Sequence, residues 1–356
     1  MLIRRAMGDK VRCPRGRHAV AKTRVGFVGC GGIAEAHLGP LSQRDDVDLV
    51  GFTDVNEERL SVVQDKYGAE GSETFTNASD MFGALALDAA YFCLPPFAHG
   101  DELLAIERGI PFFVEKPVNL YVEQAEEIAA AARENDVMSA IGYMNRYRAG
   151  IQRVRGMLRS DPGIMAYGGW IGGTPRGSGG SGIGAWWPVK SRSGGQFHEQ
   201  VTHTVDVVLW LFGVPVEIHA YAAMGLNRDT APQYDIEDAM VVNMRFANNA
   251  VANLWSSCSS NGGGGGVTLN VYANDVTALF TGWEHSVRIL TDGGEAVEEI
   301  PGEGDIFAIE DDHFIRAVST GDRSLIQGTY DDGVTAIRVT LAADESFKTG
   351  RPVSLA

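Results

Sequence analysis

Residues 23–41, TRVGFVGCGGIAEAHLGPL, decide the fold of this chain. A short apolar run comes first, a glycine turn follows, and a helix-like segment begins at Ile33. The turn fits the pattern G-x-G-x-x-A with Gly29, Gly31 and Ala34. A buried strand that passes through such a turn into a helix is typical of a dinucleotide-binding domain.

Each position of the glycine turn has a physical reason. Gly29 permits the tight turn out of the strand, and Gly31 lacks a Cβ, so a pyrophosphate can approach the backbone. Ala34 is small enough for the helix to pack closely on the strand. The helix N-terminus that follows presents free N–H groups and a partial positive charge to phosphate. We therefore expect Gly29, Gly31, Gly32 and Ile33 to bind the cofactor.

A second apolar run, VDLVGFTD at residues 47–54, ends in Asp54, about twenty residues beyond the glycines. A carboxylate there can accept hydrogen bonds from the ribose hydroxyls and would repel a 2′-phosphate. Residues 55–58 contain no arginine or lysine. This pattern favours NAD over NADP. The alternative is that Asp54 is only a turn or helix-capping acid.

Strands and helices then alternate, which indicates a parallel sheet covered on both faces. The expected strands lie at residues 88–96, 110–117 and 138–147, and the expected helices at 98–109 and 121–137. Ligands of such sheets bind at the carboxyl ends of the strands. Three polar or proline-containing features fall at such ends: CLPP at 93–96, EKP at 115–117 and YMNRY at 143–147.

The EKP feature places Glu115 and Lys116 at the mouth of a buried strand. Pro117 keeps Lys116 out of the α conformation, so the strand cannot continue directly into a helix. A partly desolvated lysine in a cleft can lower its pKa and donate or shuttle a proton. The alternative is a solvated ion pair at the strand end.

Residues 194–206, GGQFHEQVTHTVD, contain two histidines and two acids. His198 and His203 are five residues apart and diverge on a helix, so the spacing of an H-E-x-x-H zinc site is absent and we expect no metal. Glu199 and His203 are four apart and share a helix face. This spacing predicts an acid–imidazole pair, although His203 could also be a hydrogen-bonded core histidine. Asp206, one turn further, is either structural or orients the site.

The composition of the chain limits its partners. The 356 residues are enough for two domains, since single cores rarely exceed about 250–300 residues. A formal charge of −16 argues against nucleic acid and anionic membranes as partners. No apolar run approaches the ~20 residues that span a bilayer. The four cysteines are scattered without C-x-x-C spacing, which suits a reducing cytoplasm.

Taken together, these motifs resemble the glucose–fructose oxidoreductase / inositol dehydrogenase / MocA (Gfo/Idh/MocA) family. The resembling segments are GFVGCGGIAEAH, FTD, CLPPFAH, VEKPV, GGQFHEQVTHTVD and the C-terminal region from EDDHF to residue 355. The resemblance covers nearly all of residues 23–355. The glycine turn is shared by many dehydrogenases, whereas EKP followed by acid-x-x-x-His is much more specific.

The resemblance implies an α/β Rossmann domain followed by an α+β domain with a large, open, mostly antiparallel sheet. We expect a flexible basic leader at 1–22, a Rossmann domain at 23–145, and a substrate domain at 146–356 whose C-terminal segment can pack back on the first. Strand-like patterns at 216–225, 237–258, 267–282 and 286–293 agree independently. In family members this sheet commonly forms an interface, which implies a homodimer or homotetramer.

The resemblance also assigns residues to the site. It implies that Glu199 contacts substrate and that His203 is catalytic, with Lys116 as their partner. The expected cofactor-binding residues are completed by Leu94, Pro95, Pro96, His99, Glu115 and Lys116. The expected substrate-binding residues are Lys116, Asn145, Arg146, Trp186, Trp187, Glu199 and His203. Tryptophans embedded in the glycine-rich segment 168–195 suit either a lid over a sugar ring or plain loop anchors. Arg148 could also line the cleft, and Lys190 and Arg192 could close it, but for Arg148 and Arg192 we favour solvated charge.

The expected activity is NAD-dependent oxidation of a secondary alcohol of a sugar, glycoside or cyclitol. His203 would remove the hydroxyl proton, Lys116 would hydrogen-bond the same oxygen, and Glu199 would bind an adjacent hydroxyl. Two alternatives stay open. One is a non-redox enzyme that retains NAD and uses transient oxidation for elimination or glycoside cleavage. The other is a catalytically silent sugar-sensing protein on the same fold.

Overall fold

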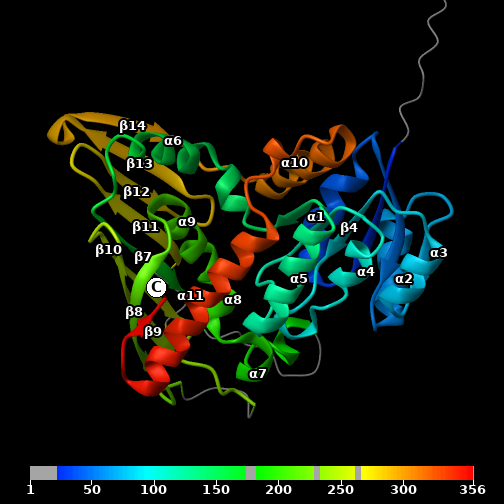
Figure 1. Ribbon diagram of the computed structural model, residues 1–356, viewed down its shortest axis with the longest axis horizontal. Coiled ribbons are helices and arrows are strands. Elements are labelled where there is room, and N and C mark those ends of the chain that lie inside the picture. The colour runs from blue at the N-terminus through cyan, green and yellow to red at the C-terminus, as the bar shows by residue number, and fades with distance from the viewer. Residues whose placement is uncertain (1–21, 174–181, 228–232, 261–265, 356) are drawn as a thin grey trace, which may run out of the picture.

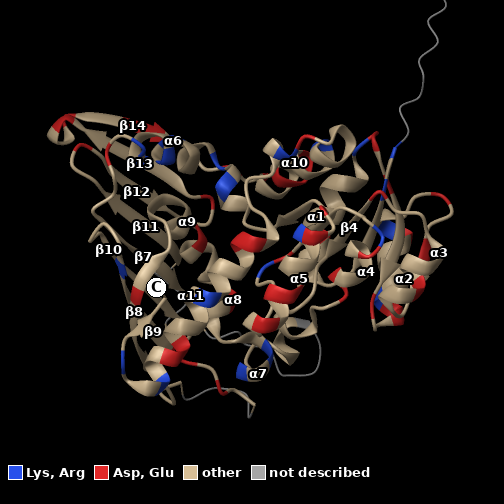
Figure 2. Ribbon diagram, in the orientation of Figure 1, with Lys and Arg blue, Asp and Glu red and all other residues tan. Residues whose placement is uncertain are grey.

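The computed structural model describes residues 22–173, 182–227, 233–260 and 266–355. The expected leader, the middle of the expected lid at 174–181, and the glycine run at 262–265 lie outside the described residues. Figure 1 shows two sheets at opposite ends of the molecule, with helices between them. In Figure 2 acidic residues are spread over both parts, with basic residues interspersed.

The first sheet has six parallel strands in the order β3-β2-β1-β4-β5-β6, which confirms the predicted Rossmann domain. Its strands are β1 (Thr23–Val28), β2 (Val47–Thr53), β3 (Glu73–Phe75), β4 (Ala89–Phe92), β5 (Phe112–Val114) and β6 (Ser139–Ile141). The helices that alternate with them are α1 (Gly32–Ser42), α2 (Glu57–Tyr67), α3 (Ala78–Ala84), α4 (Glu102–Ile106) and α5 (Val122–Glu134).

The second sheet has nine strands in the described residues, in the order β14-β13-β12-β11-β7-β10-β9-β8-β15. Its pairs are antiparallel except β7 with β10, as the predicted mostly antiparallel sheet requires. The strands are β7 (Met165–Ile171), β8 (Pro215–Ala223), β9 (Ala239–Phe246), β10 (Val251–Ser257), β11 (Gly266–Tyr272), β12 (Thr277–Thr281), β13 (Ser286–Thr291), β14 (Ala296–Ile300) and β15 (Val353–Ser354).

Side chains along the central strands of the second sheet alternate between buried and exposed. One face is therefore packed against the body of the protein and the other faces solvent. The helices α6 (Ala149–Leu158) and α9 (Thr202–Phe212) contact the buried face.

The C-terminal helices bridge the two sheets. In Figure 1, α11 (Tyr330–Thr349) runs between them, and it contacts α5 and β6 on one side and β8 and α9 on the other. Helix α10 (Ile306–Thr320) lies against α1. Its Phe314 packs edge-on against Tyr91, whose ring stacks between those of Phe27 and Phe113. The core of the first domain thus includes a residue from the far end of the chain.

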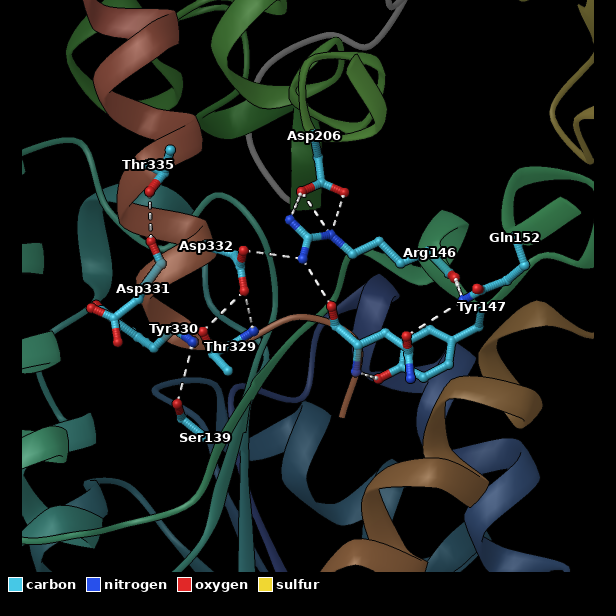
Figure 3. Close-up of polar contacts among 11 residues, drawn as sticks. Ser139, Arg146, Tyr147, Gln152, Asp206, Thr329, Tyr330, Asp331, Asp332 and Thr335 are labelled. Atoms are coloured by element: carbon cyan, nitrogen blue, oxygen red, sulfur yellow. Dashed lines mark hydrogen bonds and ion pairs between the residues drawn. The ribbon is translucent and has the colours of Figure 1, made fainter. Parts of the chain in front are cut away.

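The segment after β6 differs from the prediction. The strand expected to run to residue 147 ends at Ile141, and residues Met144–Tyr147 form a short 3₁₀ helix, η2. Its Arg146 is 3% exposed, and its Nε and Nη2 donate to Asp206 of α9 at 3.1 and 2.7 Å. Nη1 donates to the carbonyl oxygen of Gln327 at 2.8 Å and lies 3.1 Å from Asp332 of α11 (Figure 3). Arg146, predicted to bind substrate, instead joins three segments of the fold.

We expect Arg146→Met to lower the free energy of unfolding by about 3–5 kcal/mol, because it leaves the Asp206 carboxylate buried without its ion partner. Urea unfolding followed by circular dichroism measures the change. Arg153→Met is the matched control, since Arg153 is solvent-exposed and pairs with an exposed Glu298, and it should cost at most about 1 kcal/mol. Equal losses in the two variants would contradict a structural role for the buried pair.

Candidate active site

Lys116 follows β5 at the carboxyl end of the first sheet, and a cis peptide bond joins it to Pro117. Its Nζ lies 2.9 Å from Glu199 Oε1 and donates a second bond, also 2.9 Å, to the carbonyl oxygen of Glu199. Glu199 Oε2 accepts a bond of 2.8 Å from the indole N–H of Trp187. Both carboxylate oxygens are therefore held, and the two domains meet at this ion pair.

The same contact explains a departure from the predicted helix. A single helix was expected through Glu199 and His203, but the structure has α8 (Gln196–Glu199) and α9, with a break at residues 200–201. In a continuous helix the Glu199 carbonyl would accept the N–H of His203. Here Lys116 takes that carbonyl, and the His203 N–H turns to Gln200 at 3.4 Å. Glu199 therefore ends α8 and His203 lies in α9, so the two residues do not share a face of one continuous helix.

His203 lies in the first turn of α9 and is 7% exposed. Its ring makes edge contacts with Tyr143 and Trp283, with centroids 6.2 and 6.0 Å away. Burial lowers its pKa well below the usual value, and the positive charges of Lys116 and Arg148, together with His285, lower it further. The imidazole is therefore neutral at physiological pH, the form that can accept a proton.

Lys116, Glu199 and His203 line one cavity of about 170 Å³. The other lining residues are Ile33, Glu115, Trp170, Ile183, Gln200, Trp283 and Phe307. Ile33 comes from the start of α1, so the cavity reaches the glycine turn. The structure thus brings the three predicted catalytic residues together beside the predicted cofactor loop.

The glycine turn fits a dinucleotide. Gly29 has a φ of +87°, and a Cβ there would lie 2.4 Å from the carbonyl oxygen of Cys93. A Cβ at Gly31 or Gly32 would meet nothing within 4 Å, so open space adjoins the start of α1. No side chain caps that eleven-residue helix. Its first N–H groups are available to an anionic group such as a pyrophosphate.

Asp54 holds the glycine turn in place. Its carboxylate accepts the backbone N–H of Cys30 and of Asn56, each at 2.9 Å. This is the alternative role considered for it, yet a carboxylate has about four acceptor positions and can also receive a ribose hydroxyl. The nearby Arg59 is paired with Glu35. The positive charge of Arg59 is therefore already paired, so it is not free to bind a 2′-phosphate, and this favours NAD over NADP.

The remaining predicted cofactor residues surround the ends of β4 and β5. Leu94 lies beside Gly29, and Pro95 precedes a short 3₁₀ helix, η1, that begins at Pro96. His99 is buried, with Nδ1 2.5 Å from Glu102. No contact in the described residues tests a cofactor role for these four, which stays a prediction.

Glu115 supports Lys116 from behind rather than pairing with it. Its Oε2 accepts the backbone N–H of Lys116 at 3.0 Å, and its Oε1 lies 3.1 Å from His37 Nε2. His37 Nδ1 lies 2.8 Å from Asp311 of α10. The sequence carried no signal for this buried chain of contacts, because its members are distant along the chain.

Four predicted substrate-binding residues do not line the cavity. Arg146 is in the ion pair described above, and Asn145 is buried with its side-chain oxygen bound to Arg148 Nε. Trp187 is buried behind Glu199, and Trp186 packs in the same apolar cluster. The aromatic residues of the cavity are instead Trp170, Trp283 and Phe307. Pairing of distant strands places Trp283 there, which local sequence patterns do not reveal.

Two further predictions concern basic and metal-ligating residues. Arg148, expected to be solvated, is fully buried and donates to the carbonyl oxygens of Glu303 and Trp283. His198 is a core histidine whose two ring nitrogens both have partners, Thr340 Oγ1 at 2.8 Å and the Asn119 carbonyl oxygen at 3.1 Å.

Within the described ranges no three His, Cys, Asp or Glu side chains are grouped to hold a metal. None of the helices described there is long and apolar enough to cross a membrane.

A Rossmann domain whose glycine turn opens beside a lysine–imidazole cavity defines a dinucleotide-dependent oxidoreductase. Residues 23–143 match the oxidoreductase family with an NAD-binding Rossmann fold, Gfo/Idh/MocA, and residues 174–279 match the C-terminal domain of the same family. The chain belongs to this family and is an NAD-dependent oxidoreductase, as the sequence predicted.

Similar proteins include dehydrogenases of cyclitols and sugars. The chain is 26% identical over 286 residues to scyllo-inositol 2-dehydrogenase (NAD(+)) of Bacillus subtilis, covering 76% of this chain and 78% of that protein. It is 24% identical over 353 residues to inositol 2-dehydrogenase of Rhizobium meliloti, covering 94% and 99%. The structure of levoglucosan dehydrogenase in complex with NADH superposes with a TM-score of 0.80 at 16% identity, covering 94% and 99%.

We expect the His203 imidazole to stay neutral at pH 6, where an ordinary histidine with a pKa of about 6.5 is mostly protonated. Its proton uptake on unfolding should also make folding less favourable as the pH falls below about 6.5. Nitrogen NMR of histidine-labelled protein measures the titration, and the His203→Asn variant identifies the signal. A His203 midpoint near 6.5 in the folded protein would contradict the account of its burial.

Proposed function

We propose that the protein oxidises a secondary alcohol of a sugar, glycoside or cyclitol, with His203 and Lys116 acting on the hydroxyl oxygen. The observation that carries this proposal is the convergence of the Lys116 ammonium and the neutral His203 imidazole in one cavity beside the glycine turn. The cyclitol and sugar dehydrogenases among the similar proteins support the substrate class.

His203 acts as the general base. A neutral imidazole accepts the hydroxyl proton as the carbinol C–H bond breaks. Bound NAD supplies the acceptor for the hydride of that bond. The lowered pKa of His203 keeps the base free of protons before the substrate arrives.

Lys116 stabilises the charge that develops on the same oxygen. An ammonium has three donors, and two of them are bound to Glu199 in this structure. The third can point to the substrate oxygen, where the nearly buried site strengthens the attraction. Glu199 fixes the direction of the ammonium and is close enough to accept an adjacent hydroxyl of the substrate.

We expect Lys116→Ala and His203→Ala each to lower turnover by about 10²–10⁴-fold with NAD affinity nearly unchanged, since neither residue belongs to the glycine turn. A panel of sugars, inositols and glycosides with NAD, read as NADH absorbance, gives turnover, and calorimetry gives NAD affinity. Arg153→Met, far from the cavity, is the control. Near-normal turnover in Lys116→Ala would remove that residue from the mechanism, and product without accumulated NADH would favour the non-redox alternative.

We also propose that the protein forms a homodimer or homotetramer through the solvent face of the second sheet. This face exposes two apolar cross-strand pairs, Met165 with Val251 and Tyr221 with Val241, together with Tyr167. Exposed apolar side chains of this kind on a sheet are typical of an interaction surface.

The paired change Tyr221→Glu and Val241→Glu should convert the oligomer to single chains, because it buries two charges in the apolar contact. Light scattering measures the mass in solution. Val62→Glu, an exposed apolar position on α2, is the matched control and should leave the mass unchanged. A wild-type mass of one chain would overturn the proposal.

A further inference from the structure

The active-site cavity is lined by both hydroxyl-binding and apolar side chains among the described residues. Lys116, Glu199, Gln200 and His203 supply groups that can bind hydroxyls, and Glu115 also lines the cavity. The apolar part of the lining consists of Ile33, Trp170, Ile183, Trp283 and Phe307, and Trp283 lies next to His203. A ligand that fills the cavity therefore meets hydroxyl-binding groups and apolar surface together.

Trp283 is the prominent member of the apolar part of the lining. It lies between β12 and β13, and its side chain is 41% exposed despite its size. Its ring is 5.6 Å from that of Trp170, inclined at 52°, and 6.0 Å from that of His203 at 89°. The two indoles thus form an angled aromatic wall next to the proposed base.

The backbone of this turn is anchored from within the protein. The carbonyl oxygen of Trp283 accepts a bond of 3.2 Å from Arg148 Nη2 and lies 3.0 Å from His285 Nδ1. Arg148 is fully buried, and its Nη1 donates to the Glu303 carbonyl at 2.7 Å. Because these contacts fix the backbone of the turn, the large and partly exposed Trp283 side chain is held in position to bind a ligand.

The charges in the cavity disfavour an anionic ligand. Among the described lining residues Lys116 is the one cation, and it is already paired with Glu199. Arg148 lies behind the Trp283 turn with its donors bound to carbonyl oxygens. A phosphate or carboxylate would have to compete with Glu199 for the one ammonium, at a high desolvation cost.

The size of the cavity suits a ligand of one ring. Its volume of about 170 Å³ is below the roughly 300–1,000 Å³ of pockets for larger ligands. A six-membered ring with equatorial hydroxyls carries its oxygens around the edge and only C–H bonds on its faces. Such a ring matches a cavity lined by both hydroxyl-binding groups and indoles.

We propose that Trp283, with Trp170, selects an uncharged six-membered ring whose hydroxyls are all equatorial, by covering its C–H face. This inference rests on the proposed function and specifies its substrate. Lys116 and His203 bind the edge hydroxyl to be oxidised, and Trp283 contributes to binding rather than to the chemical step. An axial hydroxyl on the covered face would lie against the indole without a hydrogen-bond partner.

The test compares wild type, Trp283→Ala and Trp283→Phe on two pairs of substrates. The first pair is scyllo-inositol with its axial epimer myo-inositol, and the second is methyl β-glucoside with methyl β-galactoside. Wild type should prefer the all-equatorial member by about tenfold or more in kcat/KM. Trp283→Ala should raise KM for that member about tenfold, leave kcat within about threefold, and abolish the preference. Trp283→Phe should retain most of the preference for the all-equatorial substrate.

Two controls separate this effect from loss of structure. Trp210→Phe keeps an aromatic ring at a position of α9 that packs on Arg155 and Arg146 and does not line the cavity, and it should alter neither KM nor the epimer preference. Calorimetric NAD affinity should be the same in all variants. Adding glucose and glucose 6-phosphate to the panel tests whether charge is disfavoured, with the uncharged sugar expected to react better.

Each outcome bears on the inference separately from the proposed function. Wild-type turnover of polyols with an unchanged epimer preference in Trp283→Ala would overturn the inference and leave the function standing. A wild-type preference for an axial epimer or for the sugar phosphate would also overturn the inference and leave the proposed function standing. Absence of NADH formation with every polyol would overturn both.

Discussion

The contact between Lys116 and Glu199 is the interaction on which the site depends. It joins residues 83 positions apart and brings the carboxyl end of the first sheet against the helices of the second domain. The ammonium also takes the carbonyl that would continue α8 into α9, so the helix break is a consequence of domain contact. A nearly buried ion pair carries a large desolvation cost, so it adds little to stability. Its contribution is to position the Lys116 ammonium and the Glu199 carboxylate in the cavity that His203 also lines.

Two further buried contacts hold the domains in that relation, and both use the C-terminal helices. Arg146 reaches Asp206 and the start of α11, while His37 lies between Glu115 and Asp311 of α10. Burial alone would lower the pKa of His37, but the charges and hydrogen bonds of Asp311 and Glu115 raise it well above its usual value. Glu115 in turn holds the Lys116 backbone. The C-terminal segment therefore supports the position of Lys116 although it does not line the cavity with charged groups.

The sequence was sufficient for features that are local or that recur as motifs. The glycine turn, the Rossmann order and the open sheet follow from hydrophobic period, glycine placement and family resemblance. The distinctive spacing and surroundings of Lys116, Glu199 and His203 predicted that they lie together, and they line one cavity; their catalytic role stays a prediction. The substrate side was predicted less well: Asn145, Arg146 and Trp187 are polar or aromatic neighbours of the site in sequence, yet the structure buries them as supports. Trp283 and Arg148 meet only through the pairing of β12 with β13 and the position of η2, which no local pattern encodes.

The central claim is that the Lys116 ammonium and the His203 imidazole serve one oxygen in one proton-transfer step. The measurement that tests it most directly is a double-mutant cycle in kcat/KM for a polyol that the wild type oxidises. Groups that act as a unit are strongly non-additive, so Lys116→Ala with His203→Ala should cost little more than the worse single change. Losses that multiply as independent factors would show that the two residues act on different steps, and would contradict the account.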